Sequence, residues 1–295
     1  MPEKESRARA DEPPYLAAMP RLVWRSALLL LRLAVLAYAA VCVLLAVFQA
    51  RLIWIPGESG GTTPREAGLA FEERMLAAAD GERIQAWFLP AEGEARGALL
   101  FSHGNAGTIE DRLDLARFFV EARVSVLLYD YRGYGLSSGS PDEDGTYADA
   151  RAAWKELVEQ RGFAPGRILL YGESLGGGVA VQLATEVRSA GLVLHDTFRS
   201  LDDAAAVHYP WLPVRLLLRS HYDNAAKIGR IAAPLLVIHS PQDEVIPFEQ
   251  GKALFDAAAE PKELLVTAGS HNGPSYLAKR EWQERVRAFV ERALP

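Results

Sequence analysis

The sequence is nearly free of cysteine. Cys42 is the single cysteine among 295 residues, and it lies inside an apolar run. One cysteine forms neither a disulfide framework nor a thiolate metal site within a chain. The six histidines show no H-E-x-x-H or similar metal-binding spacing. We therefore expect no metal and no cofactor.

An excess of positive charge is also missing. The chain has 32 Lys and Arg against 38 Asp and Glu, which gives a net charge of −6 at pH 7. The two signs are mixed along the chain, so no basic face is expected, whereas nucleic-acid binding by electrostatics needs one. We therefore expect no nucleic-acid partner.

A long apolar run is present between residues 26 and 49, which read SALLLLRLAVLAYAAVCVLLAVFQ with Arg32 as the one charge. At about 1.5 Å per residue this helix is roughly 36 Å long, enough to cross a hydrocarbon core of about 30 Å. A cleaved signal peptide is the main alternative, but the run exceeds the usual length of about 7 to 15 residues and no A-x-A site follows. We predict a single transmembrane anchor.

The charges around the apolar run predict its orientation. Basic residues are concentrated before it, and soon after it the main one is Arg51. Those that precede it are Lys4, Arg7, Arg9, Arg21 and Arg25. The positive-inside rule then places the N-terminus in the cytoplasm and the rest of the chain on the extracytoplasmic, periplasmic side.

The rest of the chain divides by composition. We predict a disordered cytoplasmic tail over residues 1–25, which are charged and proline-rich, the anchor over 26–49, and a linker over 50–68. Residues 69–295 form the remaining domain, whose size suits one α/β fold.

This domain shows the pattern of a doubly wound α/β sheet. An Asp80-Gly81 turn between two strand-like runs predicts an antiparallel hairpin at its start. Unbroken apolar runs then alternate with amphipathic stretches, which indicates parallel strands buried on both faces by helices. The runs are GALLFSHG, VSVLLYD, RILLYG, GLVLHD, APLLVIHS and KELLVTAG. The connection after the fourth of them is too long for a simple crossover, so we expect an insert over about 198–231 that forms a small lid.

The stretch Gly172-Glu173-Ser174-Leu175-Gly176 matches G-x-S-x-G between a predicted strand and a predicted helix, the context of a nucleophile elbow. A sharp strand-to-helix turn brings backbone close to backbone, so the flanking positions need glycine. A phosphate-binding loop is the competing interpretation, but Walker and dinucleotide fingerprints do not fit these glycines. We predict Ser174 to be a nucleophile.

A serine nucleophile needs a base and a group that orients the base. His271 is the histidine that follows the final predicted strand, in a turn-rich loop. Asp243 ends the strand before it, in SPQDEVIP, and Asp196 is the competing acid. The order Ser, Asp, His is that of α/β-hydrolases, and it favours Asp243 as the acid.

An acyl-transfer site must also stabilise an oxyanion with two backbone N–H donors. Leu175, directly after the nucleophile, is one candidate. The loop His103-Gly104-Asn105 after an earlier strand offers the other, the N–H of Asn105. An ordinary turn that contains Asn is the alternative interpretation of this loop.

These segments together resemble the α/β-hydrolase superfamily. The resemblance runs from about Phe71 to the C-terminus and is carried, in order, by FSHGNAG, LLYDYRGYGLSSG, YGESLGG, SPQDEVIP and the GSH loop. It implies an eight-stranded, mostly parallel sheet with helices on both faces and a short helical lid. It also implies Ser174, His271 and Asp243 as the triad, with Asn105 and Leu175 at the oxyanion hole.

The chain looks most similar to membrane-anchored bacterial serine hydrolases related to eukaryotic depalmitoylases, although it lacks the N-terminal cysteine cluster of the latter. We therefore expect a membrane-anchored serine hydrolase that cleaves a small-molecule or lipid acyl ester or thioester. An aminopeptidase on the same fold, with an acidic cluster drawn from Asp202, Asp203 and Asp223, is one alternative. An anchored binding module without catalysis is the other.

The insert gives one indication about the substrate. Residues 209–222 read YPWLPVRLLLRSHY, in which apolar side chains lie beside Arg215 and Arg219. This amphipathic stretch has three possible roles: to line an acyl pocket, to rest on anionic lipid, or to pack as part of the lid.

Overall fold

The computed structural model describes residues 14–271, 277 and 279–295, and it divides into two compact units at Phe48 and Gln49. In the first unit, helix α1 runs from Pro14 to Phe48 and so begins before the predicted start at Ser26. The predicted tail lies partly outside the described residues. Within α1, Val23–Phe48 includes an 18-residue window with a mean hydropathy of 2.6 and is long enough to cross a membrane, a property that an anchor shares with a signal sequence.

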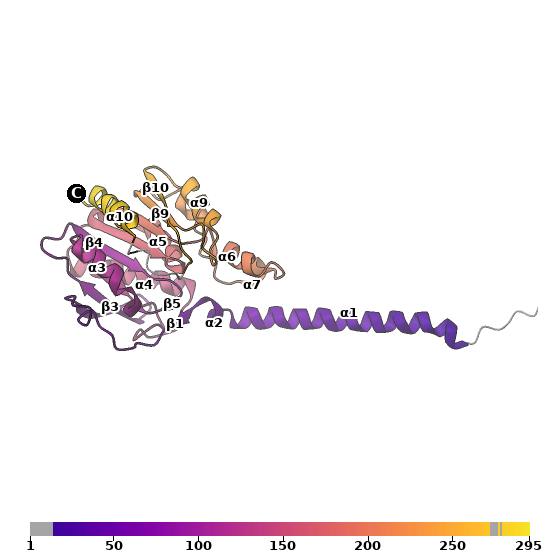
Figure 1. The fold of residues 1–295 in the computed structure, drawn as a ribbon. Helices are drawn as coiled ribbons and strands as arrows, with labels where there is room; N and C mark the ends of the chain where they lie inside the picture. Colours follow the sequence, from indigo (N-terminus) through magenta and orange to yellow (C-terminus); the bar gives the residue numbers. More distant parts are fainter. Residues whose placement is uncertain (1–13, 272–276, 278) are drawn as a thin grey trace, which may run out of the picture. The chain divides into compact units, whose positions relative to one another are not determined.

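The second unit is built on an eight-stranded sheet (Figure 1). Its strand order is β10-β9-β8-β7-β4-β6-β3-β2. The strands are β2 (Glu72–Ala77), β3 (Arg83–Leu89), β4 (Gly97–Ser102), β6 (Val124–Tyr129), β7 (Ile168–Glu173), β8 (Gly191–His195), β9 (Leu235–His239) and β10 (Lys262–Val266). Strand β3 is antiparallel to β2 and β6, and the other pairs are parallel. The predicted α/β-hydrolase architecture and its opening hairpin are confirmed.

Helices cover both faces of this sheet. On one face, α3 (Leu113–Glu121) and α10 (Arg280–Ala293) pack on Leu99 and its neighbours. On the other, α4 (Glu143–Lys155), α5 (Leu175–Glu186) and α9 (Phe248–Ala257) pack around Leu100. Every residue of strands β4, β6, β8 and β9 is buried, because helices cover both faces of these strands. The carboxyl ends of the parallel strands therefore share one edge, where the predicted site residues follow.

The insert (residues 198–231) lies between β8 and β9. It consists of three short helices, α6 (Leu201–His208), α7 (Val214–Leu217) and α8 (Ala225–Ile228). The predicted break in the strand and helix alternation is therefore present, and its content is helical as expected.

Residues 49–57, which we call the connector, overlap the start of the predicted linker and contain regular secondary structure. They form a short helix α2 (Ala50–Ile53) and a strand β1 (Ile55–Pro56) that pairs in parallel with β5 (Ala106–Gly107). Ile53 and Trp54 are buried in the core. The apolar side chains and the backbone pairing together explain why this stretch is folded onto the second unit.

Candidate active site

Ser174 lies between β7 and α5 with backbone angles φ 52° and ψ −118°. A positive φ is unfavourable for a residue with a Cβ and costs about 1–3 kcal/mol, so the surrounding structure must enforce it. The two flanking glycines allow the close approach. A Cβ on Gly176 would lie 2.0 Å from the carbonyl oxygen of Ser102, and a Cβ on Gly172 would lie 2.5 Å from that of Gly176. The turn thus has the tight geometry that the sequence predicts.

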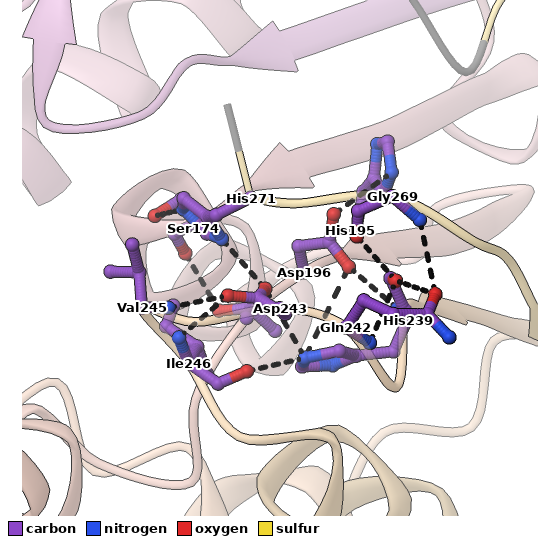
Figure 2. A network of polar contacts seen from close by, with 12 residues as sticks. Ser174, His195, Asp196, His239, Gln242, Asp243, Val245, Ile246, Gly269 and His271 are labelled. Carbon is purple, nitrogen blue, oxygen red and sulfur yellow. Dashed lines mark hydrogen bonds and ion pairs between the residues drawn. The ribbon is translucent and has the colours of Figure 1, made fainter. Parts of the chain in front are cut away.

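His271 lies between Ser174 and Asp243 (Figure 2). Its Nε2 is 3.0 Å from the Oγ of Ser174, and its Nδ1 is 2.7 Å from the Oδ2 of Asp243. In the neutral ring that donates from Nδ1 to the carboxylate, Nε2 carries the lone pair and accepts the serine hydroxyl. The structure therefore brings the three predicted residues together. The imidazole of His271 lies between the hydroxyl of Ser174 and the carboxylate of Asp243, as a general base oriented by an acid requires.

The Asp243 carboxylate is buried and held on several sides. Its Oδ1 accepts hydrogen bonds from the N–H groups of Val245, at 2.9 Å, and Ile246, at 2.8 Å. Its Oδ2 also lies 3.5 Å from the Nε2 of His239. Burial by itself raises the pKa of Asp243, but the contacts with His239 and His271 and the Ile246 N–H outweigh it and hold the pKa well below its usual range. Asp243 is therefore an ionised acceptor beside His271.

The pKa of His271 is shifted in the opposite direction. Burial lowers the pKa of the imidazole, and the hydrogen bond and charge of Asp243 raise it by more, so that the net pKa is above the ordinary 6.5. An imidazole with this pKa can take up a proton near neutral pH and return it.

Asp196, the competing acid, serves a different contact. Its Oδ1 accepts the N–H of Ser240 at 3.1 Å, and its Oδ2 lies 3.4 Å from the Nε2 of His195. In the structure, Asp243 thus contacts His271, whereas Asp196 contacts the loop that follows β9.

Two polar residues beside Asp243 join its loop to the loop of His271. Ser240 donates from Oγ to the carbonyl oxygen of Gly269 at 2.5 Å, and the N–H of Gly269 donates to Gln242 Oε1 at 3.1 Å (Figure 2). The prediction from sequence missed these positioning contacts. Ser240 and Gln242, the polar residues of the SPQ tripeptide directly before Asp243, are the feature of the sequence that could have indicated these contacts.

The His103-Gly104-Asn105 loop lies against the nucleophile turn. A Cβ built on Gly104 would be 3.5 Å from the Cβ of Ser174. Within residues 14–271, 277 and 279–295, no hydrogen bond leaves the N–H of Asn105 or that of Leu175. Both predicted donors therefore remain available to a bound oxyanion, and Leu175 adds the positive end of the α5 dipole.

Contacts with two other segments hold this loop in place. The hydroxyl of Tyr131 donates to the carbonyl oxygen of His103 at 2.8 Å, and that of Tyr134 donates to the carbonyl oxygen of Asn105 at 2.7 Å. The Asn105 amide donates to the carbonyl oxygen of Ile53 at 3.0 Å. Burial and the charge of Arg112 lower the pKa of His103 to about 3, so this residue is a neutral part of the loop.

The three acidic residues of the insert each have a different partner. Asp202 pairs with His221 at 2.8 Å and Asp203 with Arg215 at 3.1 Å. Asp223 accepts the N–H of Ala226 at 3.0 Å. Their carboxylates thus serve local contacts in the insert rather than one shared site for a substrate ammonium group.

One buried cluster has the residue types of a metal site. Ligand atoms of Asp196, His239 and Asp243 lie within 4.8 Å of one another. The Nε2 of His239, however, is 2.9 Å from the carbonyl oxygen of Ile246 and donates its proton there. Asp243 Oδ2 already accepts His271. In that tautomer the Nε2 atom of His239, which faces Asp196 and Asp243, is a donor and offers no lone pair to a metal.

Comparison with known proteins places the chain in a family. A family model described as serine aminopeptidase, S33, matches residues 93–219. The uncharacterized protein Rv2307c of Mycobacterium tuberculosis is 42% identical over 246 residues, which cover 82% of this chain and 87% of that protein. The human alpha/beta hydrolase domain-containing protein 17B is 35% identical over 230 residues, covering 76% and 77% of the two chains.

Solved structures share the fold. An esterase of Pyrococcus furiosus, Pf2001, superposes with a TM-score of 0.69 at 19% identity, covering 82% of this chain and 98% of that one. A puromycin-hydrolyzing peptidase of Mycobacterium tuberculosis superposes with a TM-score of 0.65 at 22% identity, covering 77% of this chain and 39% of that one. With relatives above 30% identity across most of its length and this architecture, the chain belongs to the α/β-hydrolase superfamily.

Proposed function

We propose that this protein is a membrane-anchored serine hydrolase that cleaves a carboxylic ester or thioester through an acyl-enzyme intermediate. The observation that carries the proposal is the continuous contact from Ser174 through His271 to Asp243, next to two available backbone N–H groups. Family membership and the strained serine turn support it.

In the first half of the reaction, the Oγ of Ser174 attacks the carbonyl carbon while its proton passes to Nε2 of His271. The imidazolium that forms is stabilised by Asp243, which stays ionised. The N–H groups of Asn105 and Leu175 stabilise the oxyanion of the tetrahedral intermediate. When this intermediate collapses, the C–O or C–S bond breaks, and the alcohol or thiol leaves with the proton from His271.

In the second half, a water molecule replaces the leaving group. His271 takes a proton from the water as its oxygen attacks the acyl carbon, and the same N–H pair again stabilises the oxyanion. The bond to Ser174 then breaks, and the serine oxygen recovers a proton from His271. The products are a carboxylic acid and the free enzyme.

Active-site labelling tests this proposal. The full chain should react with a fluorophosphonate probe and lose that reaction in Ser174→Ala. Ser189→Ala is the matched control, because Ser189 follows α5 outside the triad and should label like the parent chain. Equal labelling of Ser174→Ala and the parent chain would overturn the proposal, and no labelling of the parent chain would favour a binding module without catalysis.

The type of bond is tested with matched substrates that carry one acyl group. We expect nitrophenyl esters and acyl thioesters to be cleaved much faster than amino-acid anilides, because the acidic residues of the insert are engaged with local partners. Faster release from the anilides would instead support the aminopeptidase alternative.

The anchor is part of the same proposal. Val23–Phe48 has the length and hydropathy of a span, and the basic residues that precede it support a cytoplasmic N-terminus with residues 49–295 on the periplasmic side. Full-length protein should stay with membranes through alkaline extraction, and protease added outside spheroplasts should digest residues 49–295. Release of a shortened soluble protein would indicate a cleaved signal instead.

A further inference from the structure

Gln49, the residue that directly follows α1, is hydrogen-bonded to the insert. Its side chain is buried although the residue comes immediately after Phe48, the last residue of that helix. The Gln49 amide donates to the carbonyl oxygen of Leu217 at 3.0 Å, and its oxygen accepts the N–H of Arg219 at 2.8 Å. Two backbone groups of the insert are therefore held at the first residue after the apolar helix.

The connector also holds the oxyanion loop. The N–H of Ile55 donates to the carbonyl oxygen of Asn105 at 2.8 Å, and the amide of Asn105 donates to the carbonyl oxygen of Ile53 at 3.0 Å. Residues 49–57 thus connect the insert to the loop that supplies an oxyanion donor.

Large apolar side chains are exposed on both the insert and the connector. Leu216 is 85% exposed and Trp211 is 55% exposed on the insert, and Leu52 and Ile55 of the connector are more than half exposed. Exposed apolar groups of this size are more than packing of the insert requires, and such a concentration indicates contact with a partner or a membrane.

The charge of the two segments favours an anionic partner. Residues 49–57 and 209–222 contain three arginines, Arg51, Arg215 and Arg219, and no aspartate or glutamate, although Arg215 pairs with Asp203 of α6 at 3.1 Å. Apolar side chains next to arginine, without acidic residues, suit the boundary between acyl chains and anionic headgroups. Because Gln49 is the first residue after α1, a bilayer crossed by α1 would be present at these segments at high effective concentration.

The insert also contacts the loop of the catalytic acid. His208, at the end of α6, contacts the carbonyl oxygen of Val245 through Nε2 at 2.7 Å, and Val245 donates its N–H to Asp243. The insert is therefore in contact with the loop that carries Asp243.

We propose that the connector and residues 209–222 form one docking surface that lies in the headgroup layer of an anionic bilayer, so that the site takes its acyl substrate from that layer. This inference rests on the proposed anchoring and hydrolase function. It adds a partner, the lipid surface, and a substrate class, an acyl ester or thioester embedded in lipid.

Depth-dependent fluorescence quenching tests the docking surface in the full chain. The single native cysteine is replaced as Cys42→Ser, and an NBD label is attached to Leu216→Cys or, as the control, to Met75→Cys. Met75 is an exposed apolar residue on the edge strand β2. The vesicles are phosphatidylcholine with or without phosphatidylglycerol, and they carry nitroxide-labelled lipid.

We expect strong quenching at position 216, little at position 75, and stronger quenching at 216 when phosphatidylglycerol is present. Equal quenching at the two positions in chains that float with the vesicles would overturn the docking surface. A blue shift at 216 without quenching would also overturn it, because that result indicates a second copy or another protein as the occupant.

A substrate ratio tests the consequence for catalysis. Trp211→Ser combined with Leu216→Ser should lower the rate on a long-chain ester embedded in vesicles, relative to a short soluble ester, by about fivefold, since less apolar surface enters the bilayer. Met75→Ser is the control and should leave the ratio unchanged. An unchanged ratio in the double variant overturns the substrate class. Fluorophosphonate labelling of Ser174 in the same samples reports separately whether the hydrolase proposal holds.

Discussion

The triad network and the docking surface are built from opposite kinds of contact. Around Asp243, buried polar atoms are bonded to one another, and each side chain has a defined partner. The insert instead exposes apolar side chains such as Leu216 and is fixed through backbone groups that bond to Gln49. In the proposed function, reactivity therefore depends on buried side-chain geometry, whereas access to substrate depends on how a surface is tethered.

Asp243→Asn should have the largest effect and tests whether the two carboxylates near His271 differ in role. It removes the charge that stabilises the imidazolium and favours the wrong tautomer, so kcat on a soluble ester should fall by about 10³- to 10⁴-fold. Asp196→Asn is the matched control, and we expect a loss of less than about tenfold because its contact is with the Ser240 N–H. Equal losses would remove the distinction between the two acids.

Gly176→Ala should have the next largest effect, on stability of the buried region. The added Cβ would meet the carbonyl oxygen of Ser102 at 2.0 Å, and this backbone contact must be relieved at a cost of about 3 kcal/mol in the free energy of unfolding. Gly166→Ala is the control, because a Cβ there has no atom within 4 Å, and it should change stability by less than about 1 kcal/mol. Urea unfolding of the full chain in detergent compares the two, and similar midpoints would contradict the tight turn.

The pH dependence should follow His271. The base must be neutral to act, and its pKa is raised above the ordinary 6.5 by Asp243 against the effect of burial. Activity should therefore rise with pH, about tenfold per unit below a midpoint that lies above 6.5. The residual activity of Asp243→Asn should show this midpoint at lower pH.

The same pKa shift has the opposite consequence for stability. A raised pKa in the folded state stabilises the fold below the unfolded pKa of His271, and this contribution is lost as pH rises through the folded pKa.

The rate profile provides the contradicting outcome for the pH prediction. A flat dependence of the rate on pH from 5 to 8 would contradict His271 as the base.

Gln49→Leu should have the smallest effect and tests the tether of the insert. It keeps the volume but leaves the Leu217 carbonyl and the Arg219 N–H without their partner, which should cost about 1 kcal/mol of unfolding free energy. Gln182→Leu on α5 is the control, since its amide bonds at the surface to Glu186, and it should have little effect. Protease cleavage within the insert should also accelerate only in Gln49→Leu, and no difference between the variants would contradict the tether.

The position of the candidate site was predictable because its residues follow the buried strands. The apolar runs that form β7 and β9 end at the elbow of Ser174 and at the loop of Asp243, and in parallel strands these ends meet at one edge. The support of the site was less predictable. Tyr134 bonds to Asn105 across 29 positions and Asn105 to Ile53 across 52, and no local pattern encodes such contacts.

The sequence by itself determined the α/β architecture, the apolar N-terminal helix and the identity of Ser174, His271 and Asp243 as the residues to examine. Periodicity and glycine spacing are local properties, so they can be read without knowledge of the fold. Only the tertiary structure decided that Asp243 and not Asp196 contacts His271, and that residues 49–57 hold the insert and the oxyanion loop. These choices depend on which loops meet in space, and that is set by the packing of the whole sheet and its helices.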